Sequence, residues 1–319
     1  MIVMLLKGVN TMKLGVVIVT YNRLDLLKEC IEACINQEEK FSKILVVNNA
    51  STDGTTEYLQ HLKYENLEIL NTGSNLGGAG GFYKGIEKSI EYDLDYLLLI
   101  DDDAILNISY NKEILKHMNK KEENVCAYSG TVKTNNIIQT EHRRHLKKNF
   151  KCVNSTLEEY LKEYFDYELS TFCGLYIKMD IIRKIGLPEK DFFIWFDDTE
   201  YSLRICKYGK IRNINSTFLN HKTKIANSTG FNWKSYYSLR NQIVILKKYY
   251  SKFTLFKFTF KMRVMIIVGK ITAILKRNNY YNKVSQIYKD ALNDGLKNNL
   301  GKNEKYTFNV KIDKGESKK

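Results

Sequence analysis

Three consecutive aspartates, Asp101–Asp103, follow directly on the apolar run "YLLLI". In an extended backbone alternate side chains face the same way, so Asp101 and Asp103 can converge while Asp102 points elsewhere. Two converging carboxylates are costly unless a cation neutralises them. Hard oxygen ligands suit Mg²⁺ or Mn²⁺, which commonly share their coordination shell with substrate phosphates. The triplet therefore predicts a divalent-metal site; the alternative is an exposed acidic loop or a helix cap.

A glycine cluster, "NLGGAGGF", begins at Asn75. Its glycines permit close approach of the backbone to a ligand, and the start of the helix that follows favours anions. The cluster follows the third predicted strand and lacks GxGxxG, so it is no dinucleotide fingerprint, and no GK[ST] completes a P-loop. By itself it predicts either a ligand-binding loop or a tight turn.

An acidic and aromatic stretch, "WFDDTEY", runs from Trp195 to Tyr201. Asp197 and Asp198 beside aromatic rings can place a general base in a partly desolvated pocket. The alternative is an acidic first turn that stabilises the following helix. Further along, His221 follows a strand-like segment, although a lone histidine is more often structural than a ligand.

Buried strands alternate with helical segments over the first hundred residues. Apolar, β-branched runs predict strands at 14–21, 43–48, 67–71 and 96–100. This alternation predicts an α/β fold with a mainly parallel sheet flanked by helices. Ligands of such sheets bind beyond the carboxyl ends of the strands, which is where the aspartate triplet lies.

The last quarter of the chain is basic. Residues 247–319 hold 18 Lys and Arg against 5 Asp and Glu, almost the whole of the chain's formal net charge of +14. The segment from about residue 230 to residue 300 predicts basic, aromatic, amphipathic helices with no window that could span a bilayer. An anionic partner is expected, whether membrane lipid, nucleic acid or a phosphorylated substrate; the alternative is a solvated basic surface. The tail at 301–319 is expected to be polar and frayed.

Length and cysteine usage bound the remaining possibilities. The 319 residues suffice for one substantial core and a smaller appended unit. Six cysteines lack zinc-ribbon spacing, and Cys30 and Cys34 lie one helical turn apart on an apolar face, which predicts reduced, buried, cytoplasmic thiols. Residues 1–11 have neither the cleavage site of a signal peptide nor the length of a membrane helix, and are expected to lie outside the fold.

The order of these motifs resembles glycosyltransferase family 2, whose inverting nucleotide-sugar transferases have the Rossmann-like GT-A fold. The resemblance spans residues 13–245 and rests on "VVIVTYNR", "VVNNASTDGT", "NLGGAGGF", "LLIDDDA", "FFIWFDDTEYSLR", His221 and "YYSLRNQ". The glycine motif, the "FIxWxDD" pattern and the "LRN" element are most similar to bacterial galactofuranosyltransferases. The resemblance implies a GT-A domain at 12–229, a membrane-associating helical region at 230–300 and a polar tail at 301–319.

The resemblance also implies roles for individual residues. The nucleotide sugar would be bound by Thr20, Tyr21, Arg23, Asn49, Asn75, Gly77, Gly78, Asp102 and Trp195. Asn49 stands where many relatives have an aspartate facing the uracil ring, and its amide oxygen can still accept from the base N–H. Asp101, Asp103 and His221 would hold Mn²⁺ or Mg²⁺. Asp198 would be the catalytic base, with Asp197 beside it.

The implied reaction is metal-dependent transfer of a hexose with inversion at the anomeric carbon. The first candidate is galactofuranose, moved singly from UDP-galactofuranose to a lipid-linked glycan acceptor for the cell surface. The enzyme would then be cytoplasmic and peripheral on the inner face of an anionic cell membrane. A dTDP-rhamnose donor or another UDP-hexose is the alternative within the family. Two alternatives come from other classes: a nucleotidyltransferase, and a basic protein that only binds membrane or nucleic acid. If the protein is a glycosyltransferase, no nucleic-acid partner is expected.

Overall fold

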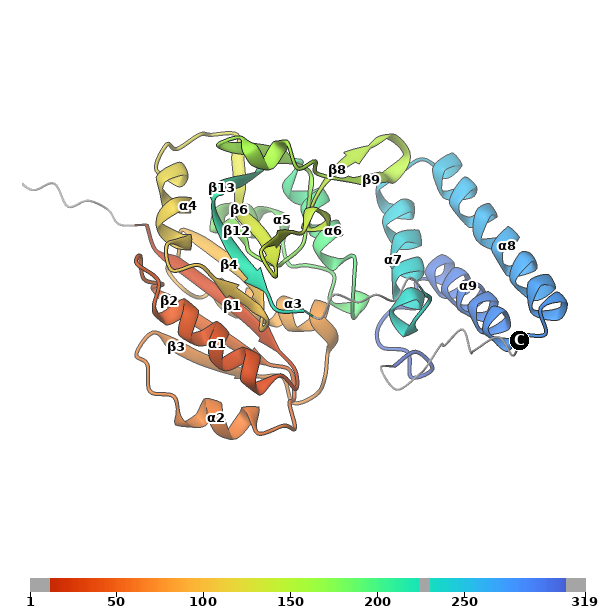
Figure 1. The fold of residues 1–319 in the computed structure, drawn as a ribbon, viewed down its shortest axis with the longest axis horizontal. Coiled ribbons are helices and arrows are strands. Elements are labelled where there is room, and N and C mark those ends of the chain that lie inside the picture. The colour runs from red at the N-terminus through yellow and green to blue at the C-terminus, as the bar shows by residue number, and fades with distance from the viewer. Residues whose placement is uncertain (1–11, 224–229, 308–319) are drawn as a thin grey trace, which may run out of the picture.

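The fold was obtained as a computed structural model, which describes residues 12–223 and 230–307 (Figure 1). Four parallel strands form one half of its main sheet in the order β4–β1–β2–β3. They are β1 (Leu14–Thr20), β2 (Lys43–Asn48), β3 (Leu67–Asn71) and β4 (Tyr96–Asp101). Every residue of β1 is buried, as its unbroken apolar run requires of a central strand. The predicted alternation and the predicted parallel arrangement are confirmed for this half.

The other half of the sheet is mixed and continues the order as β10–β13–β6–β12–β4. It contains β6 (Val125–Thr134), β10 (Tyr164–Tyr167), β12 (Leu175–Lys178) and β13 (Lys210–His221), with the short β5 (Ala104–Leu106) and β7 (Ile137–Ile138) at its margins. β12 runs antiparallel to both of its neighbours, and β13 is parallel to β6. A separate small sheet holds β8 (Arg143–Lys147), β9 (Lys151–Asn154) and β11 (Leu169–Ser170).

Helices cover both faces of the main sheet. One core lies under α1 (Leu24–Ile35), α2 (Thr55–His61) and α4 (Tyr110–Met118), and it includes the fully buried Cys30 and Cys34. The other core lies under α3 (Gly77–Ser89), α5 (Met179–Ile185) and α6 (Asp197–Ile205). All six cysteines are free thiols. Single 3₁₀ turns occur at Thr140–His142, Lys148–Phe150, Glu159–Leu161 and Lys190–Phe192.

Three helices form the C-terminal region: α7 (Trp233–Tyr249), α8 (Lys252–Leu275) and α9 (Asn279–Lys297). Their shared core is built around Tyr236, Tyr237 and Ile287, and Phe193 from the sheet-bearing part packs into it. Figure 1 shows α8 at the end of the molecule farthest from the sheet. Among the helices of the described residues, none has the length and apolar character needed to cross a membrane.

The segment after α9 is packed rather than frayed. Tyr306 is only 3% exposed and stacks on Tyr236 with ring centroids 4.3 Å apart. Arg240 donates to the carbonyl oxygen of Gly301 at 2.7 Å. The prediction of a frayed tail is therefore wrong for residues 301–307, because aromatic stacking and backbone hydrogen bonds hold them against α7. The expectations for residues 1–11 and for the rest of the tail lie outside the described residues.

Candidate active site

The aspartate triplet lies at the carboxyl end of β4 and meets His221 there. β5 pairs antiparallel with the end of β13, which sets His221 opposite Ala104. Nε2 of His221 is 3.2 Å from Oδ1 of Asp103. The ligand atoms of Asp101, Asp103 and His221 all lie within 4.8 Å of one another. The strand pairing thus brings together the three residues that were expected to hold a metal.

Burial sets the electrostatics of this cluster. Burial, reinforced by the charge of Asp103, raises the pKa of Asp101 to about 7. Burial also raises the pKa of Asp102 to about 6, against the opposing charge of Arg23. For Asp103, burial is outweighed by the close approach and charge of His221 and by the charge of Arg23, which hold its pKa below the ordinary value. The charges of His221 and Arg23 thus do not offset the burial of Asp101, and the charge of Arg23 does not offset that of Asp102, so both carboxyl groups are costly to ionise without a further cation.

A divalent cation fits these residues. Oδ1 of Asp103 is buried and has no aligned hydrogen-bond donor among the described residues, although His221 is near. Such an orphaned carboxylate oxygen is costly unless something binds it. Two carboxylates and an imidazole offer hard oxygen ligands and one nitrogen, a set that suits Mn²⁺ or Mg²⁺.

A second group of candidate ligands shares His221. The ligand atoms of His142, Cys173 and His221 also lie within 4.8 Å of one another, and the rings of the two histidines are 5.0 Å apart. A set with sulfur and nitrogen suits Zn²⁺ better than Mg²⁺. Sequence analysis missed His142 and Cys173 because no spacing links them to the aspartates; only the mixed half of the sheet brings them close.

Asp102 points away from the metal-ligand cluster and fastens the end of β1. Its Oδ2 accepts from the Thr20 hydroxyl at 2.8 Å, and its Oδ1 accepts from Arg23 at 3.1 Å. Arg23 also donates to Oδ2 of Asp103 at 2.5 Å. Asp102 thus stays outside the ligand group of Asp101, Asp103 and His221. The cause is not strand alternation, because β4 ends at Asp101 and the next two aspartates lie in a turn, where Arg23 bridges them.

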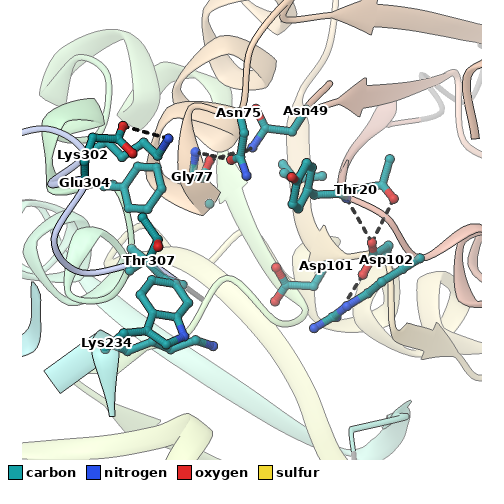
Figure 2. Close-up of a pocket in the computed structure, with 17 residues that line it drawn as sticks. Thr20, Asn49, Asn75, Gly77, Asp101, Asp102, Lys234, Lys302, Glu304 and Thr307 are labelled. Atoms are coloured by element: carbon teal, nitrogen blue, oxygen red, sulfur yellow. Dashed lines mark hydrogen bonds and ion pairs between the residues drawn. The ribbon is translucent and has the colours of Figure 1, made fainter. Parts of the chain in front are cut away.

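The glycine turn is held by the two asparagines. Asn49 donates to the Gly77 carbonyl oxygen at 3.0 Å, and its own amide oxygen accepts from the Leu76 N–H at 3.0 Å. Oδ1 of Asn75 accepts from the Gly77 N–H at 2.9 Å (Figure 2). The polar atoms of the Asn49 side chain therefore form hydrogen bonds with this turn. From the sequence, they were expected to contact the nucleotide base.

Gly77 is a position where only glycine fits. Its φ is +73°, and a Cβ there would lie 2.0 Å from the carbonyl oxygen of Phe193. The same oxygen accepts from the Ala79 N–H at 3.2 Å. The glycine motif is thereby docked directly on the loop that carries the "FIxWxDD" motif.

Asp197 and Asp198 begin α6, with Asp197 buried and Asp198 partly buried. Burial and the neighbouring charge of Asp198 raise the pKa of Asp197 well above its ordinary value, and Asp101 adds to this. Burial also raises the pKa of Asp198, against the charge of Arg144. Oδ1 of Asp198 accepts from the backbone N–H and the hydroxyl of Thr199, at 2.5 Å and 3.0 Å. Raised pKa values suit groups that hold or take a proton near neutral pH.

The loop before α6 is strained and held from α7. Phe193, Trp195 and Phe196 all have left-handed φ values, between 65° and 72°. Asn241 donates to the carbonyl oxygens of Phe192, Ile194 and Trp195 at 2.8–3.2 Å. Arg240 donates to the Phe192 carbonyl oxygen at 3.0 Å. The "LRN" element thus fixes the backbone that leads into the acid pair.

A cavity of about 510 Å³ opens beside the cluster (Figure 2). Nine of the predicted site residues line it: Thr20, Tyr21, Arg23, Asn49, Asn75, Gly77, Gly78, Asp101 and Asp102. Five others predicted for the site are not among the lining residues: Asp103, Trp195, Asp197, Asp198 and His221. Their neighbours Phe193 and Ile194 do line it, which sets the acid-pair loop at the cavity wall.

The C-terminal region supplies one side of the cavity, which sequence analysis missed. Its lining residues are Trp233, Lys234, Lys302, Glu304 and Thr307. Burial, followed by the charge of Arg23, lowers the pKa of Lys234. Nζ of Lys234 lies 5.6 Å from the ring centres of both Trp195 and Trp233. The only signal in the sequence was a basic and aromatic "NWK" after His221, in a segment interpreted as membrane-associating.

Glu200 has a structural setting instead of a catalytic one. It is buried, with Oε2 bonded to Arg204 at 2.7 Å and Oε1 bonded to Lys248 at 2.8 Å. These partners hold its pKa below the ordinary value despite burial. Because both of its carboxylate oxygens are paired, one of them with Lys248 of α7, Glu200 links α6 to α7.

Comparison with known proteins decides the family. Residues 15–185, more than half of the chain, match the family model described as glycosyl transferase family 2. The chain belongs to this family. Membership confirms the recognition made from the motifs and places the chain among the glycosyltransferases.

Two curated members of the class match part of the chain. A poly(ribitol-phosphate) beta-glucosyltransferase from Bacillus spizizenii is 30% identical over 117 residues, which is 35% of this chain and 18% of the relative. Galactofuranosyltransferase GlfT1 from Mycolicibacterium smegmatis is 32% identical over 88 residues, 28% of this chain and 29% of the relative. The matches span less than a third of the length of either relative.

Solved structures confirm the predicted GT-A-like fold. GalNAc-T7, crystallised with UDP, GalNAc and Mn²⁺, has a TM-score of 0.60 at 16% identity over 75% of this chain and 48% of that chain. S. aureus TarS 1-349, in complex with UDP-GlcNAc, has a TM-score of 0.55 at 15% identity over 90% of this chain and 81% of that one.

Proposed function

We propose that this family member transfers a sugar from a UDP-sugar to an acceptor hydroxyl with inversion at the anomeric carbon. The observation that carries the proposal is the cluster of Asp101, Asp103 and His221, because Asp101 also lines a cavity large enough for a nucleotide sugar. The UDP-sugar and Mn²⁺ complexes of the similar structures support the same donor class.

The donor diphosphate would lie between the metal-ligand cluster and the cationic wall of the cavity. Asp101, Asp103 and His221 would hold a divalent ion, which supplies neutralisation of the charge that develops on the departing diphosphate. Arg23 and Lys234 line the same cavity and would bind the phosphate oxygens. Gly78 leaves open space, with no atom within 4 Å of where its Cβ would be, so the donor can approach the backbone there.

Asp198 would act as the general base. The acceptor oxygen forms its bond to the anomeric carbon as the bond from that carbon to the diphosphate oxygen breaks, and the hydroxyl proton passes to the Asp198 carboxylate. A raised pKa makes Asp198 a better proton acceptor than an ordinary aspartate. Asp197, raised further by burial, would stay protonated and donate a hydrogen bond to a sugar hydroxyl, with Trp195 at the sugar's side.

Galactofuranose is the donor sugar we propose, from UDP-galactofuranose. The "FIxWxDD" and "LRN" motifs support it, as does the partial match to a galactofuranosyltransferase. The match to a glucosyltransferase keeps another UDP-hexose as the alternative, and dTDP-rhamnose as a further one. Family membership weighs against a nucleotidyltransferase and against a protein that only binds membrane or nucleic acid.

The proposed acceptor is a lipid-linked glycan at the inner face of the cell membrane. This would make the protein a peripheral, cytoplasmic enzyme of cell-surface polysaccharide synthesis that adds a single residue. The excess of positive charge in the last quarter of the chain supports an anionic surface as its partner.

The test is turnover of a panel of nucleotide sugars with Mn²⁺, with the anomeric configuration of the product read by NMR. The proposal expects transfer from UDP-galactofuranose with inversion, lost in Asp198→Asn while UDP binding persists, and kept in the exposed control Asp25→Asn. Turnover of another UDP-sugar instead would contradict the proposed donor sugar but would agree with the proposed mechanism. A retained configuration, or full turnover by Asp198→Asn, would contradict the mechanism.

A further inference from the structure

The outer face of α8 carries a continuous apolar stripe. Its residues recur every three or four positions, which places them on one side of the helix. They are Phe253, Phe256, Phe260, Val264, Ile267, Ile271 and Ile274, each 40–76% exposed. Val268 and Leu275 widen the stripe and are also exposed. Nine exposed apolar side chains on one helix form the kind of patch that marks an interaction surface.

The opposite face of α8 is already used for packing. Met262, Gly269 and Ala273 are buried there. At Gly269 the helix is so close to α9 that a Cβ would lie 3.0 Å from the Cβ of Ser285. α8 is therefore apolar on both sides, and packing within the protein explains only one. Within residues 12–223 and 230–307 nothing covers the stripe, and α8 lies outermost in Figure 1.

Positive charges flank the stripe on both sides. Given about 100° per residue, one flank of the stripe holds Lys252, Arg263 and Lys270, and the other holds Lys257 and Lys261, all of them exposed. No Asp or Glu occurs anywhere from residue 201 to residue 289. The next acid along the chain, Asp290, is bonded to Lys305 and Tyr306. The surface is therefore apolar at its centre and purely cationic at its edges.

We propose that α8 is a membrane-surface helix that lies in the plane of an anionic phospholipid bilayer. The apolar stripe would reach the boundary between headgroups and acyl chains, and the flanking cations would meet the lipid phosphates. Aromatic rings beside cations suit this depth: Phe256 and Phe260 stack at 6.0 Å, and Nζ of Lys257 lies 4.3 Å from the centre of the Phe253 ring.

Charge favours lipid over a second copy of this chain. Two α8 helices packed stripe to stripe would bring two sets of five cations together, with no acid on either helix to oppose them. Like charges set against each other in an interface are costly. An anionic bilayer has the complementary charge and accepts the apolar centre. The inference extends the proposed peripheral location to a defined contact surface and does not depend on the donor sugar.

The test is co-sedimentation of the full-length protein with vesicles of phosphatidylcholine alone and of phosphatidylcholine mixed with phosphatidylglycerol. One variant removes the stripe (Phe256→Ser, Phe260→Ser, Ile267→Ser) and is matched by a control at exposed apolar residues elsewhere (Ile137→Ser, Leu157→Ser, Leu161→Ser). A second variant removes two flanking charges (Lys257→Gln, Lys261→Gln) and is matched by Lys147→Gln with Lys148→Gln, which are also exposed.

We expect the wild type to bind the phosphatidylglycerol vesicles and to bind neutral vesicles far more weakly. Each neutralised cation should weaken binding roughly fivefold, the stripe variant should lose binding, and both controls should bind as the wild type does. Equal binding by the stripe variant, or no binding by the wild type, would overturn the proposal. So would a lipid-free dimer that the stripe variant converts to monomer, which would assign the stripe to a second copy. UDP binding, measured on the same samples, reports the proposed function separately.

Discussion

Asn241 on α7 donates its side-chain amide to the Trp195 carbonyl oxygen at 2.8 Å. The bond joins the C-terminal helices to a backbone turn in the left-handed region, immediately before the acid pair. The C-terminal region is therefore part of the site architecture, since it holds the acid-pair loop from behind and lines the cavity through Lys234 and Lys302.

Replacing Asn241 with alanine should damage catalysis more than substrate binding. The change removes three hydrogen bonds to carbonyl oxygens, and loss of buried partners costs about 1–3 kcal/mol. Released from these bonds, the loop can leave its strained conformation and misplace Asp198. We expect kcat to fall by more than KM rises, alongside a lower melting temperature. Gln242→Ala is the matched control, since its amide bonds only Ser238; equal kinetics of the two variants would contradict this account.

Gly77→Ala should disrupt the donor site, and Gly73→Ala should not. Both glycines have φ near +75°, so both variants carry similar backbone strain of about 1–2 kcal/mol. Only at Gly77 would the new Cβ collide with the Phe193 carbonyl oxygen; at Gly73 no atom lies within 4 Å. Calorimetric UDP binding and unfolding by urea measure the contrast. Similar losses of UDP affinity and stability in the two variants would mean that backbone strain, and not the contact with the acid-pair loop, causes the effect of Gly77→Ala.

Lys234→Ala should weaken donor binding. Lys234 is half-buried and lines the cavity, and a charge-assisted bond to phosphate contributes about 1.5–3 kcal/mol. We expect UDP affinity to fall by roughly tenfold or more, with partial recovery in Lys234→Arg. The exposed Lys63→Ala serves as a control. Unchanged affinity in Lys234→Ala would place the diphosphate elsewhere in the cavity.

Asp290 should make the packing of residues 301–307 depend on pH. Burial acts to raise the pKa of Asp290, but hydrogen bonds from Lys305, Tyr306 and Gln286 outweigh it and hold the pKa below the ordinary 3.8. Its stabilisation is therefore complete above that value and is lost as the pH falls through the folded-state pKa. Asp290→Asn should lower the melting temperature at neutral pH, and the gap to the wild type should close as the pH falls below the ordinary aspartate pKa and through the lowered folded-state pKa. A gap that persists in acid would contradict this.

Much of the site was predictable because local pattern determined it. The run of apolar residues before Asp101 gives a strand buried on both faces, and a parallel sheet leaves no other place for the triplet than the carboxyl edge. The glycine motif and the acid pair were likewise visible as residue types at short spacing.

The remaining parts depend on long-range contacts that no local pattern encodes. His221 reaches Asp103 only because β5 turns back to pair with the end of β13. The resemblance assigns Asn49 to the nucleotide base, yet in the structure its side chain forms hydrogen bonds with the glycine turn. Lys234 and Lys302 enter the cavity because α7 and the segment after α9 pack against the loop at residues 191–195. Charge patterning alone predicted only a basic surface.

The most direct test of the central claim is titration of UDP into the protein with Mn²⁺ and with EDTA, comparing the wild type, Asp103→Asn and the exposed control Asp180→Asn. The account predicts that Mn²⁺ tightens UDP binding roughly tenfold or more in the wild type and in the control, and that the gain disappears in Asp103→Asn. Equal UDP affinity with and without the ion in the wild type, or an undiminished gain in Asp103→Asn, would contradict a metal site at the end of β4.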